Sequence, residues 1–244
     1  MIIAILQARL SSTRLPGKVL AALLDEPMIM RQVERLRHSA LIDRLVVATS
    51  SHPSDDALAD LLHSRGVEVR RGSLDDVVGR FGAIVDEFSP DVVVRLTGDC
   101  PLADPEVIDR VIQSHIDSGR DYSSNTLSPT YPDGLDVEAI DIAAWRRLVA
   151  TDLTAREREH VTLGLYGRPE EFTLHSVTQD EDHSALRWTV DVADDLEFVR
   201  AVYKRLYYEN PGFGQADVLA LLREHPELNR TESDLARNAG LASE

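Results

Sequence analysis

Short apolar runs alternate with amphipathic segments along the first half of this chain, and this alternation limits the possible folds more than any other feature. The apolar runs predict buried strands at residues 2–6, 44–49, 67–72 and 91–99. The amphipathic segments predict helices near residues 27–38, 54–64, 74–88 and 104–117. Strands that alternate with helices in this way are typical of an α/β domain with a mostly parallel sheet flanked by helices.

After residue 120 the pattern changes to shorter elements separated by turn-forming residues. This half predicts strands at 135–140, 172–177 and 186–190, and helices at 141–150, at 155–166 and from Val192 onward. No repeat or low-complexity segment interrupts the chain. We therefore expect a single domain over residues 1–224, followed by a polar tail over 225–244 that is partly disordered.

Charge and cysteine content exclude several classes of function. The formal net charge is −16, and a field of this sign repels nucleic acids and anionic membranes, so we expect neither as a partner. Cys100 is the only cysteine, which rules out an intramolecular disulfide and argues against a thiolate metal site. The apolar start MIIAIL has no basic segment before it, and no apolar run approaches the length of a membrane span. We expect a cytoplasmic protein.

The segment QARLSSTRLPGK, directly after the first predicted strand, concentrates positive charge in an acidic chain. Arg9, Arg14 and Lys18 lie here, and no acidic residue precedes Asp25. Arginine forks, an ammonium group and hydroxyls in a turn-rich loop suit the oxygens of a polyphosphate. The spacing is not that of a Walker A loop. A solvated basic loop is the alternative; under the polyphosphate interpretation, the ligand rather than the protein supplies the counter-charge.

Two aspartates at the ends of predicted strands are candidate magnesium ligands. Asp99 follows a nearly all-apolar strand, and Asp191 stands in a similar position in RWTVDVADD. Mg²⁺ prefers one or two carboxylates together with substrate phosphates. Asp99 could instead cap its loop, whereas Asp194 and Asp195 are expected to cap the helix that follows. In parallel sheets, loops at the carboxyl ends of the strands converge on one ligand site.

Other residue types give weaker indications. His160 and His183 are either surface residues or cleft residues, and His183 precedes Arg187 by four positions, as a pair that binds an anionic acceptor could. No two histidines have the spacing of a metal site. Cys100 adjoins Asp99, but no activating base is evident, so a nucleophilic role is not favoured.

Several blocks of the sequence, in order, resemble one family. QARLSSTRLPGKVL is similar to the amino-terminal signature of cytidylyltransferases that make CMP-activated acidic sugars, such as CMP-Kdo and CMP-sialic acid synthetases. The match is strongest to the SpsF (spore coat polysaccharide) branch of that family. Its other matching blocks are RGSLDDVVGRF, RLTGDCPL, SNTLSPTYPDGLDVEAI, REHVT and LRWTVDVADDLEFV. RLTGDCPL has the SpsF form rather than the Kdo form, which leaves the acceptor open.

The resemblance implies a glycosyltransferase-A-like (Rossmann-like) nucleotidyltransferase fold, with a small β-containing acceptor and dimerisation portion. The nucleotide-binding part would span about 1–118, the acceptor and dimerisation part about 119–190, and the closing helices 191–224. The implied partners are CTP and a small anionic hydroxylated acceptor, in a homodimer. The products would be a CMP conjugate and pyrophosphate.

The resemblance also assigns residues to roles. The triphosphate would be held by Arg9, Ser12, Arg14 and Lys18, while Thr49 in the 49–55 loop, Arg71 and Arg80 would lie near the nucleotide. The magnesium ligands would be Asp99 and Asp191, which with Arg14 and Lys18 form the predicted catalytic set. The acceptor would contact Tyr131, Asp133, Gly134, Asp136, Glu138, His160, His183 and Arg187.

Three other functions stay open at the level of sequence. One is a nucleotidyltransferase that uses UTP, GTP or ATP on a sugar phosphate, although such enzymes carry a more glycine-rich first loop. Another is a binding protein with the same fold and no catalysis. A sugar-nucleotide glycosyltransferase shares the architecture, but it normally carries a DxD-type metal motif, which TGDCP is not.

Overall fold

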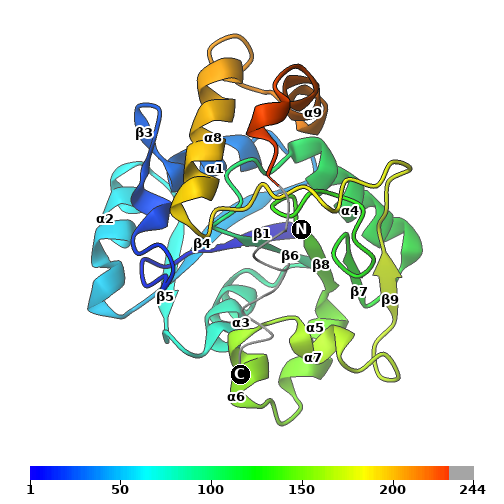
Figure 1. The fold of residues 1–244 in the computed structure, drawn as a ribbon. Helices are drawn as coiled ribbons and strands as arrows, with labels where there is room; N and C mark the ends of the chain where they lie inside the picture. Colours follow the sequence, from blue (N-terminus) through cyan, green and yellow to red (C-terminus); the bar gives the residue numbers. More distant parts are fainter. Residues whose placement is uncertain (231–244) are drawn as a thin grey trace.

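The computed structural model describes residues 1–230, so most of the predicted tail lies outside the described residues. A seven-stranded sheet with the order β5-β4-β1-β6-β8-β7-β9 runs through the molecule (Figure 1). Its first four strands along the sheet are parallel to one another and alternate with helices along the chain. The predicted α/β class with a mostly parallel sheet is thus confirmed.

The parallel strands are β1 (Ile2–Gln7), β4 (Arg44–Ser50), β5 (Val69–Gly72) and β6 (Val92–Thr97). Each coincides with a predicted strand. β1, β4 and β6 are mostly apolar because they are covered on both faces, whereas the edge strand β5 is only partly buried. From β1 the chain moves outward to β4 and β5, then returns to place β6 on the other side of β1. This reversal opens a crevice beyond the carboxyl ends of β1 and β6, where ligands bind in such sheets.

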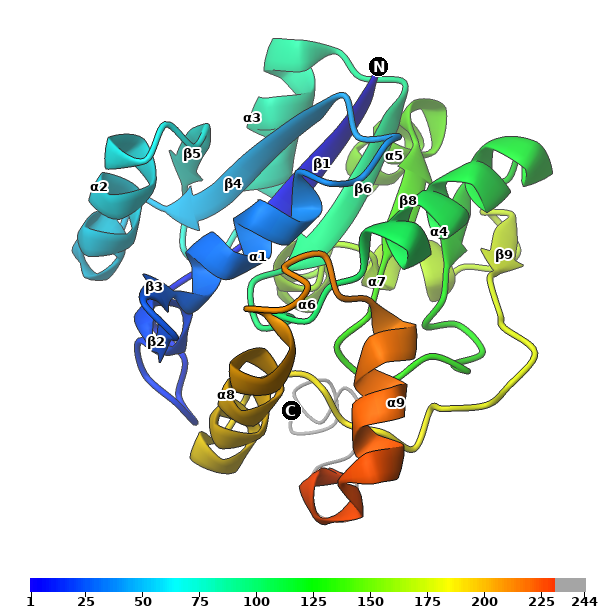
Figure 2. The ribbon, with the colours of Figure 1, turned by 90° about the horizontal axis from the view of Figure 1, so that it is seen from above.

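Helices cover both faces of the sheet and complete a three-layer arrangement (Figures 1 and 2). Along β1, Ala4 and Leu6 belong to one hydrophobic core, while Ile3 and Ile5 belong to the other. The first core is covered by α1 (Met28–Leu36), α2 (Asp56–Ser64), α4 (Pro105–Ser118), α8 (Ala193–Leu206) and α9 (Gln215–Glu224). The second is covered by α3 (Val77–Phe88), α5 (Ile142–Val149) and α7 (Leu163–Tyr166).

The second half departs from the sequence prediction in two places. Residues 155–166 form two short helices, α6 (Ala155–Glu159) and α7, because His160 leaves the helical region between them. The strand predicted at 186–190 is wrong: within residues 1–230 this segment belongs to no strand, and Arg187 forms an isolated bridge with Asp133. The sheet continues instead through β8 (Glu138–Asp141), β7 (Tyr122–Ser124) and β9 (Leu174–Ser176).

Small elements close the ends of the domain. A hairpin of β2 (Ala22–Leu23) and β3 (Glu26–Pro27) follows the first loop. Short 3₁₀ turns lie at Lys18–Leu20, Pro53–Asp55 and Pro226–Leu228. The start of α4 lies where the sequence predicts a helix, and Asp104 there accepts hydrogen bonds from the amides of Glu106 and Val107. Within residues 1–230, no helix is long and apolar enough to cross a membrane.

Candidate active site

Two adjoining clefts open beyond the carboxyl ends of β1 and β6. We call the first the loop cleft, because the segment after β1 forms one wall; its volume is about 610 Å³. The second has a volume of about 470 Å³ and is lined by five carboxylates, so we call it the acid cleft. The residues that line both clefts are Arg14, Arg95, Thr97, Asp99, His160 and Asp191. The two clefts therefore form one continuous site with a shared boundary.

The wall of the loop cleft is fixed by backbone contacts of the first loop. The Leu10 amide donates to Asp55 Oδ1 at 2.7 Å, which ties the loop to the end of β4. The Gly17 amide donates to the Leu10 carbonyl at 3.0 Å, with Gly17 at a φ of 73°, a conformation that glycine adopts without strain. Ser12 Oγ accepts from the Leu15 amide at 3.3 Å. This arrangement turns the three cations toward the cleft.

Each of the three cations has a carboxylate partner, so the expectation that only a ligand supplies the counter-charge is wrong. Lys18 Nζ lies 3.1 Å from Asp99 and 3.0 Å from Asp191, and it donates to the Val190 carbonyl at 2.7 Å. Arg14 lies 2.9 Å from Asp191. Arg9 lies 3.6 Å from Glu159. The partners come from far along the chain, which is why the local sequence gives no sign of them.

The contacts between Lys18 and the nearby aspartates explain the shifted pKa values of Lys18 and Asp99. Burial alone would lower the pKa of Lys18, but Asp99 and Asp191 outweigh burial and raise it. Burial would raise the pKa of Asp99, but the Lys18 ammonium and the Thr97 hydroxyl lower it to about 2. Lys18 and Asp99 are therefore both charged at neutral pH, as a site that exchanges ionic partners requires.

Asp99 and Asp191 fit the needs of a magnesium ion that is shared with a phosphate ligand. Both carboxylates converge on one cation, the Lys18 ammonium, so they already face a common point. Among the described residues, no group of three or more His, Cys, Asp or Glu side chains is arranged to hold a metal. Mg²⁺ normally takes one or two carboxylates and completes its shell with phosphates and water. The pair therefore suits Mg²⁺ that arrives with a nucleotide.

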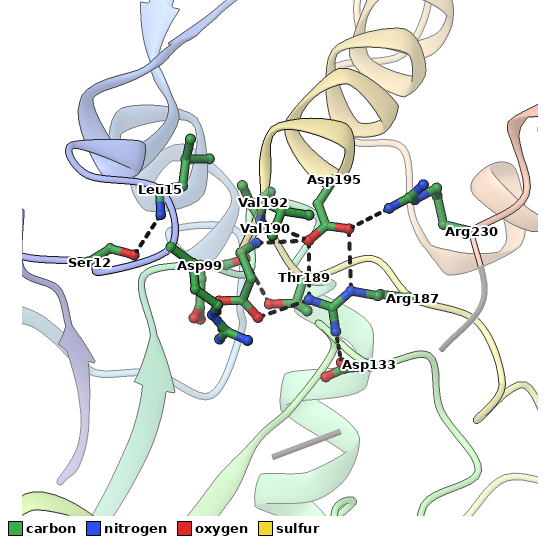
Figure 3. A network of polar contacts seen from close by, with 12 residues as sticks. Ser12, Leu15, Asp99, Asp133, Arg187, Thr189, Val190, Val192, Asp195 and Arg230 are labelled. Atoms are coloured by element: carbon green, nitrogen blue, oxygen red, sulfur yellow. Dashed lines mark hydrogen bonds and ion pairs between the residues drawn. The ribbon is translucent and has the colours of Figure 1, made fainter. Parts of the chain in front are cut away.

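Arg187 is a buried cation in the lining of the acid cleft, and it contacts three carboxylates (Figure 3). Its guanidinium donates to Asp133 at 3.0 Å, to Asp191 at 2.9 Å and to Asp195 at 3.1 Å. Asp195 also accepts from the amides of Asp191 and Val192, which confirms its predicted capping position at the start of α8. All three nitrogens of the guanidinium have carboxylate partners. Arg187 thus holds the Asp191 carboxylate in position through one of its nitrogens.

A second buried arginine neutralises Glu138 on the floor of the acid cleft. Arg95 on β6 pairs with Glu138 on the neighbouring β8. The other oxygen of Glu138 accepts from the hydroxyls of Tyr122, at 2.5 Å, and Thr162, at 2.6 Å. Both carboxylate oxygens of Glu138 are therefore engaged inside the protein.

Three residues predicted near the nucleotide do not line the loop cleft. Thr49 is fully buried within the sheet. Arg71 donates to the Ser50 carbonyl and to Asp56, so it braces the turn after β4. Arg80 lies on α3, where burial is the main cause of its lowered pKa and the charge of Arg9 lowers it further. Its Nε and Nη1 have no hydrogen-bond partner among the described residues.

Three residues predicted to contact the acceptor also lie outside the cleft linings. Tyr131 is fully buried, and its hydroxyl accepts from Arg110 at 3.3 Å. His183 lies 3.4 Å from Glu181. Gly134 is buried against the backbone of Trp188 and Thr189. The other predicted acceptor residues, Asp133, Asp136, Glu138, His160 and Arg187, do line the acid cleft.

Replacing Gly134 by alanine should destabilise the protein by about 3 kcal/mol. Gly134 has a φ of 109°, and a Cβ there would lie 2.5 Å from the Thr189 amide nitrogen. Gly66→Ala is the matched control, because Gly66 has a φ of 65° but nothing within 4 Å of its Cβ position. Urea unfolding should show a much larger loss for Gly134→Ala. Equal losses of stability for the two variants would mean that the backbone at Gly134 is not closely packed against Thr189.

Sequence reasoning missed several polar residues that line the acid cleft: Arg95, Thr97, Thr126, Thr162 and Tyr166. A signal was present for the first two, because Arg95, Thr97 and Asp99 alternate at the end of β6 and so point to one side. The others lie in the second half, where turns rather than periodic elements set their positions. No spacing rule would have found them.

A mostly parallel sheet, a cationic first loop and paired aspartates at a switch in strand order define this protein as a nucleotidyltransferase. A model of the cytidylyltransferase family matches residues 3–212, and the chain belongs to this family. It is 36% identical to the spore coat polysaccharide biosynthesis protein SpsF of Bacillus subtilis, over 93% of this chain and 95% of that one. The predicted family resemblance is therefore confirmed.

A second relative and a solved structure agree with this assignment. The 3-deoxy-manno-octulosonate cytidylyltransferase of Trichlorobacter lovleyi is 38% identical over 46% of this chain and 44% of that enzyme. The structure of a cytidylyltransferase from Leptospira borgpetersenii superposes with a TM-score of 0.88 and 27% identity, over 93% of this chain and 95% of that one.

Proposed function

We propose that this protein transfers CMP from CTP to a hydroxyl of a small hydroxylated acceptor, with Mg²⁺ as cofactor and pyrophosphate as the second product. The observation that carries the proposal is the meeting of Lys18, Asp99 and Asp191 at the junction of the two clefts. At this junction the loop cleft, which would bind the triphosphate, adjoins the acid cleft, which would bind the acceptor. The reaction joins the two ligands at this junction.

In the loop cleft, Arg9, Ser12, Arg14 and Lys18 would bind the triphosphate. Arg14 and Lys18 would exchange their carboxylate partners for phosphate oxygens, since charge-assisted hydrogen bonds to phosphate are of comparable strength. Asp99 and Asp191, once released, would hold Mg²⁺, which supplies charge neutralisation and orientation of the phosphates. Arg80 is the best-supported of the three other predicted nucleotide residues, since part of its buried guanidinium has no hydrogen-bond partner among residues 1–230.

In the acid cleft, the acceptor hydroxyl would lie among Asp133, Asp136, Glu138 and His160. Its oxygen forms a bond to the α-phosphorus while the bond from that phosphorus to the bridging oxygen of pyrophosphate breaks. The hydroxyl proton passes to a nearby carboxylate, for which Asp136 and Asp191 are the candidates, or to water. Such displacements require mainly alignment and charge neutralisation from the protein.

The remaining predictions accompany this proposal. Residues 1–118 would bind the nucleotide, 119–190 the acceptor and a second subunit, and 191–224 would close the site. The homodimer and the cytoplasmic location stay predictions. The anionic character of the acceptor, implied by the resemblance to enzymes of acidic sugars, also stays a prediction at this point.

Calorimetry with CTP, UTP, GTP and ATP tests the donor half without knowledge of the acceptor. We expect binding of CTP with Mg²⁺ that is at least about tenfold tighter than binding of the other three, a difference of about 1.4 kcal/mol. We expect EDTA to weaken CTP binding, because the released aspartates would then repel the phosphates.

Mass spectrometry of products from CTP, Mg²⁺ and a library of hydroxylated acceptors tests the transfer itself. Equal binding of all four nucleotides, or activity unaffected by EDTA, would contradict the proposal.

A further inference from the structure

A phosphorus atom that passes from one ligand to another must lie where the two binding sites meet. The residues that line both clefts include two guanidinium groups, those of Arg14 and Arg95. Arg14 belongs to the first loop, and its side chain is 39% exposed. Arg95 lies on β6 in the middle of the sheet, and its side chain is 17% exposed. Arg95 is therefore a cation that the sheet itself places at the boundary of the two clefts.

One nitrogen of the Arg95 guanidinium is not used inside the protein. Nη1 pairs with Glu138, and Nε donates to Gln7 Oε1 at a long 3.4 Å. Nη2 makes no hydrogen bond within residues 1–230, and it retains contact with solvent. Because Arg95 lines both clefts, Nη2 can donate to a ligand at their boundary while the pair with Glu138 stays intact.

Glu138 holds the Arg95 guanidinium in place. One carboxylate oxygen of Glu138 pairs with Arg95, and the other accepts from the hydroxyls of Tyr122 and Thr162, at 2.5 and 2.6 Å. Burial alone would lower the pKa of Arg95, but Glu138 outweighs burial and raises it, with smaller contributions from Tyr122 and Asp99. The guanidinium is thus a permanent charge in a preorganised position, as stabilisation of a transition state requires.

The other cations near this boundary would have to change partners before they could bind a phosphate. The ammonium of Lys18 is held by two aspartates and a carbonyl oxygen. Arg14 pairs with Asp191, and each nitrogen of Arg187 contacts a carboxylate. Of these four cations, Arg95 is the one that can accept a phosphate oxygen as a new partner with all its present contacts intact.

From these observations we infer that Arg95 contacts a non-bridging oxygen of the nucleotide's α-phosphate and stabilises the charge on the phosphoryl group during transfer. This inference rests on the proposed cytidylyl transfer and gives that reaction a catalytic residue outside the first loop. The acceptor oxygen bonds to the α-phosphorus, and the bond from that phosphorus to the bridging oxygen of pyrophosphate breaks. Arg95 donates a hydrogen bond throughout and transfers no proton, since a guanidinium stays protonated in proteins.

Binding of cytidine, CMP, CDP and CTP tests this assignment without turnover or an acceptor. Calorimetry with Mg²⁺ measures CTP directly and the weaker ligands by competition with CTP. Arg95→Met alone would leave Glu138 buried without its cation, so the compared proteins are Glu138→Gln and the double variant Glu138→Gln/Arg95→Met. The control is Arg44→Met, because Arg44 also lies on a strand and pairs with a glutamate, Glu68, but lines neither cleft.

We expect the double variant to bind CMP, CDP and CTP at least about tenfold more weakly than Glu138→Gln does, because each complex loses a hydrogen bond between charged groups. Cytidine has no phosphate and should bind equally to both. Arg44→Met should bind all four ligands like the unmodified protein. If circular dichroism shows that the double variant is not folded, Arg95→Lys replaces it, since lysine keeps a cation for Glu138 but lacks the second nitrogen.

Three results would overturn the inference. A loss for CDP and CTP but not for CMP would place Arg95 at the β-phosphate, and a loss that includes cytidine would place it at the nucleoside. Unchanged binding of all four ligands would mean that Arg95 does not contact the nucleotide. Each of these results is compatible with preferential CTP binding and CMP transfer by the unmodified protein, so failure of the inference is distinguishable from failure of the proposed function.

Discussion

Lys18→Ala is expected to lower turnover by about 10²–10³-fold while the protein remains folded. The ammonium of Lys18 lies between Asp99 and Asp191, at the junction where the leaving pyrophosphate would depart. A cation that acts on charge developing in the transition state affects turnover more than ground-state binding. We therefore expect kcat to fall by a larger factor than CTP affinity. The measurements are pyrophosphate release with an acceptor that gives product, and calorimetry with CTP.

The sequence itself offers the control for this substitution. Lys204, on the exposed side of α8, is the only other lysine, so Lys204→Ala removes the same charge away from the clefts. Turnover of Lys204→Ala should equal that of the unmodified chain. Circular dichroism and the unfolding midpoint report whether Lys18→Ala is folded. A folded Lys18→Ala variant with near-normal turnover would remove Lys18 from the catalytic set.

The parallel part of the fold could be predicted because its elements are long and periodic. β1, β4 and β6 are buried on both faces, and each therefore left a continuous apolar run in the sequence. β7 and β9 have three residues each, too few to show an alternating pattern. Their pairing with β8 depends on contacts between residues far apart in sequence, which no local pattern encodes.

The site could be predicted in part for a similar reason. The loop after β1 could be recognised because its cations are close together in the sequence, and the loop does form one wall of a cleft. Its counterions could not be predicted, because Asp99 and Asp191 become neighbours of Lys18 only after the sheet and α8 are assembled. The same holds for the acid cleft, because its carboxylates and arginines are far apart in sequence and become neighbours only in the folded protein.

Arg187 lines the acid cleft as predicted, but the sequence gives no sign of its three carboxylate partners. In sequence, an arginine four positions after a histidine suggested a binding site for an anionic acceptor. In the structure its side chain is only 4% exposed and contacts three carboxylates of the protein. We therefore propose that Arg187 is a positioning residue, which holds Asp191 and Asp133 in place for the two clefts.

Arg187→Met should lower the free energy of unfolding by about 3–5 kcal/mol, the usual cost of removing one partner from a buried ionic network. Asp133, Asp191 and Asp195 would lose their shared cation, while methionine would fill most of the volume. The contact with Arg187 helps to hold the pKa of Asp195 below its ordinary value against the opposing effect of burial. Acids with lowered pKa values stabilise the fold at neutral pH, and this contribution disappears as they are protonated on acidification. The difference between the two proteins should therefore shrink as the pH falls below about 4.

The control is Arg230→Met, since Arg230 contacts the same Asp195 at 3.3 Å but its side chain is 34% exposed. A partly solvated pair contributes little, so this variant should lose about 1 kcal/mol or less. Urea unfolding of both variants in the presence of EDTA measures the difference. A double-mutant cycle with Asp195→Asn adds a test of mechanism, because the losses from two residues in one network are not additive. If Arg187→Met lost no more stability than Arg230→Met, or if its loss were independent of pH, the three carboxylates would not depend on Arg187.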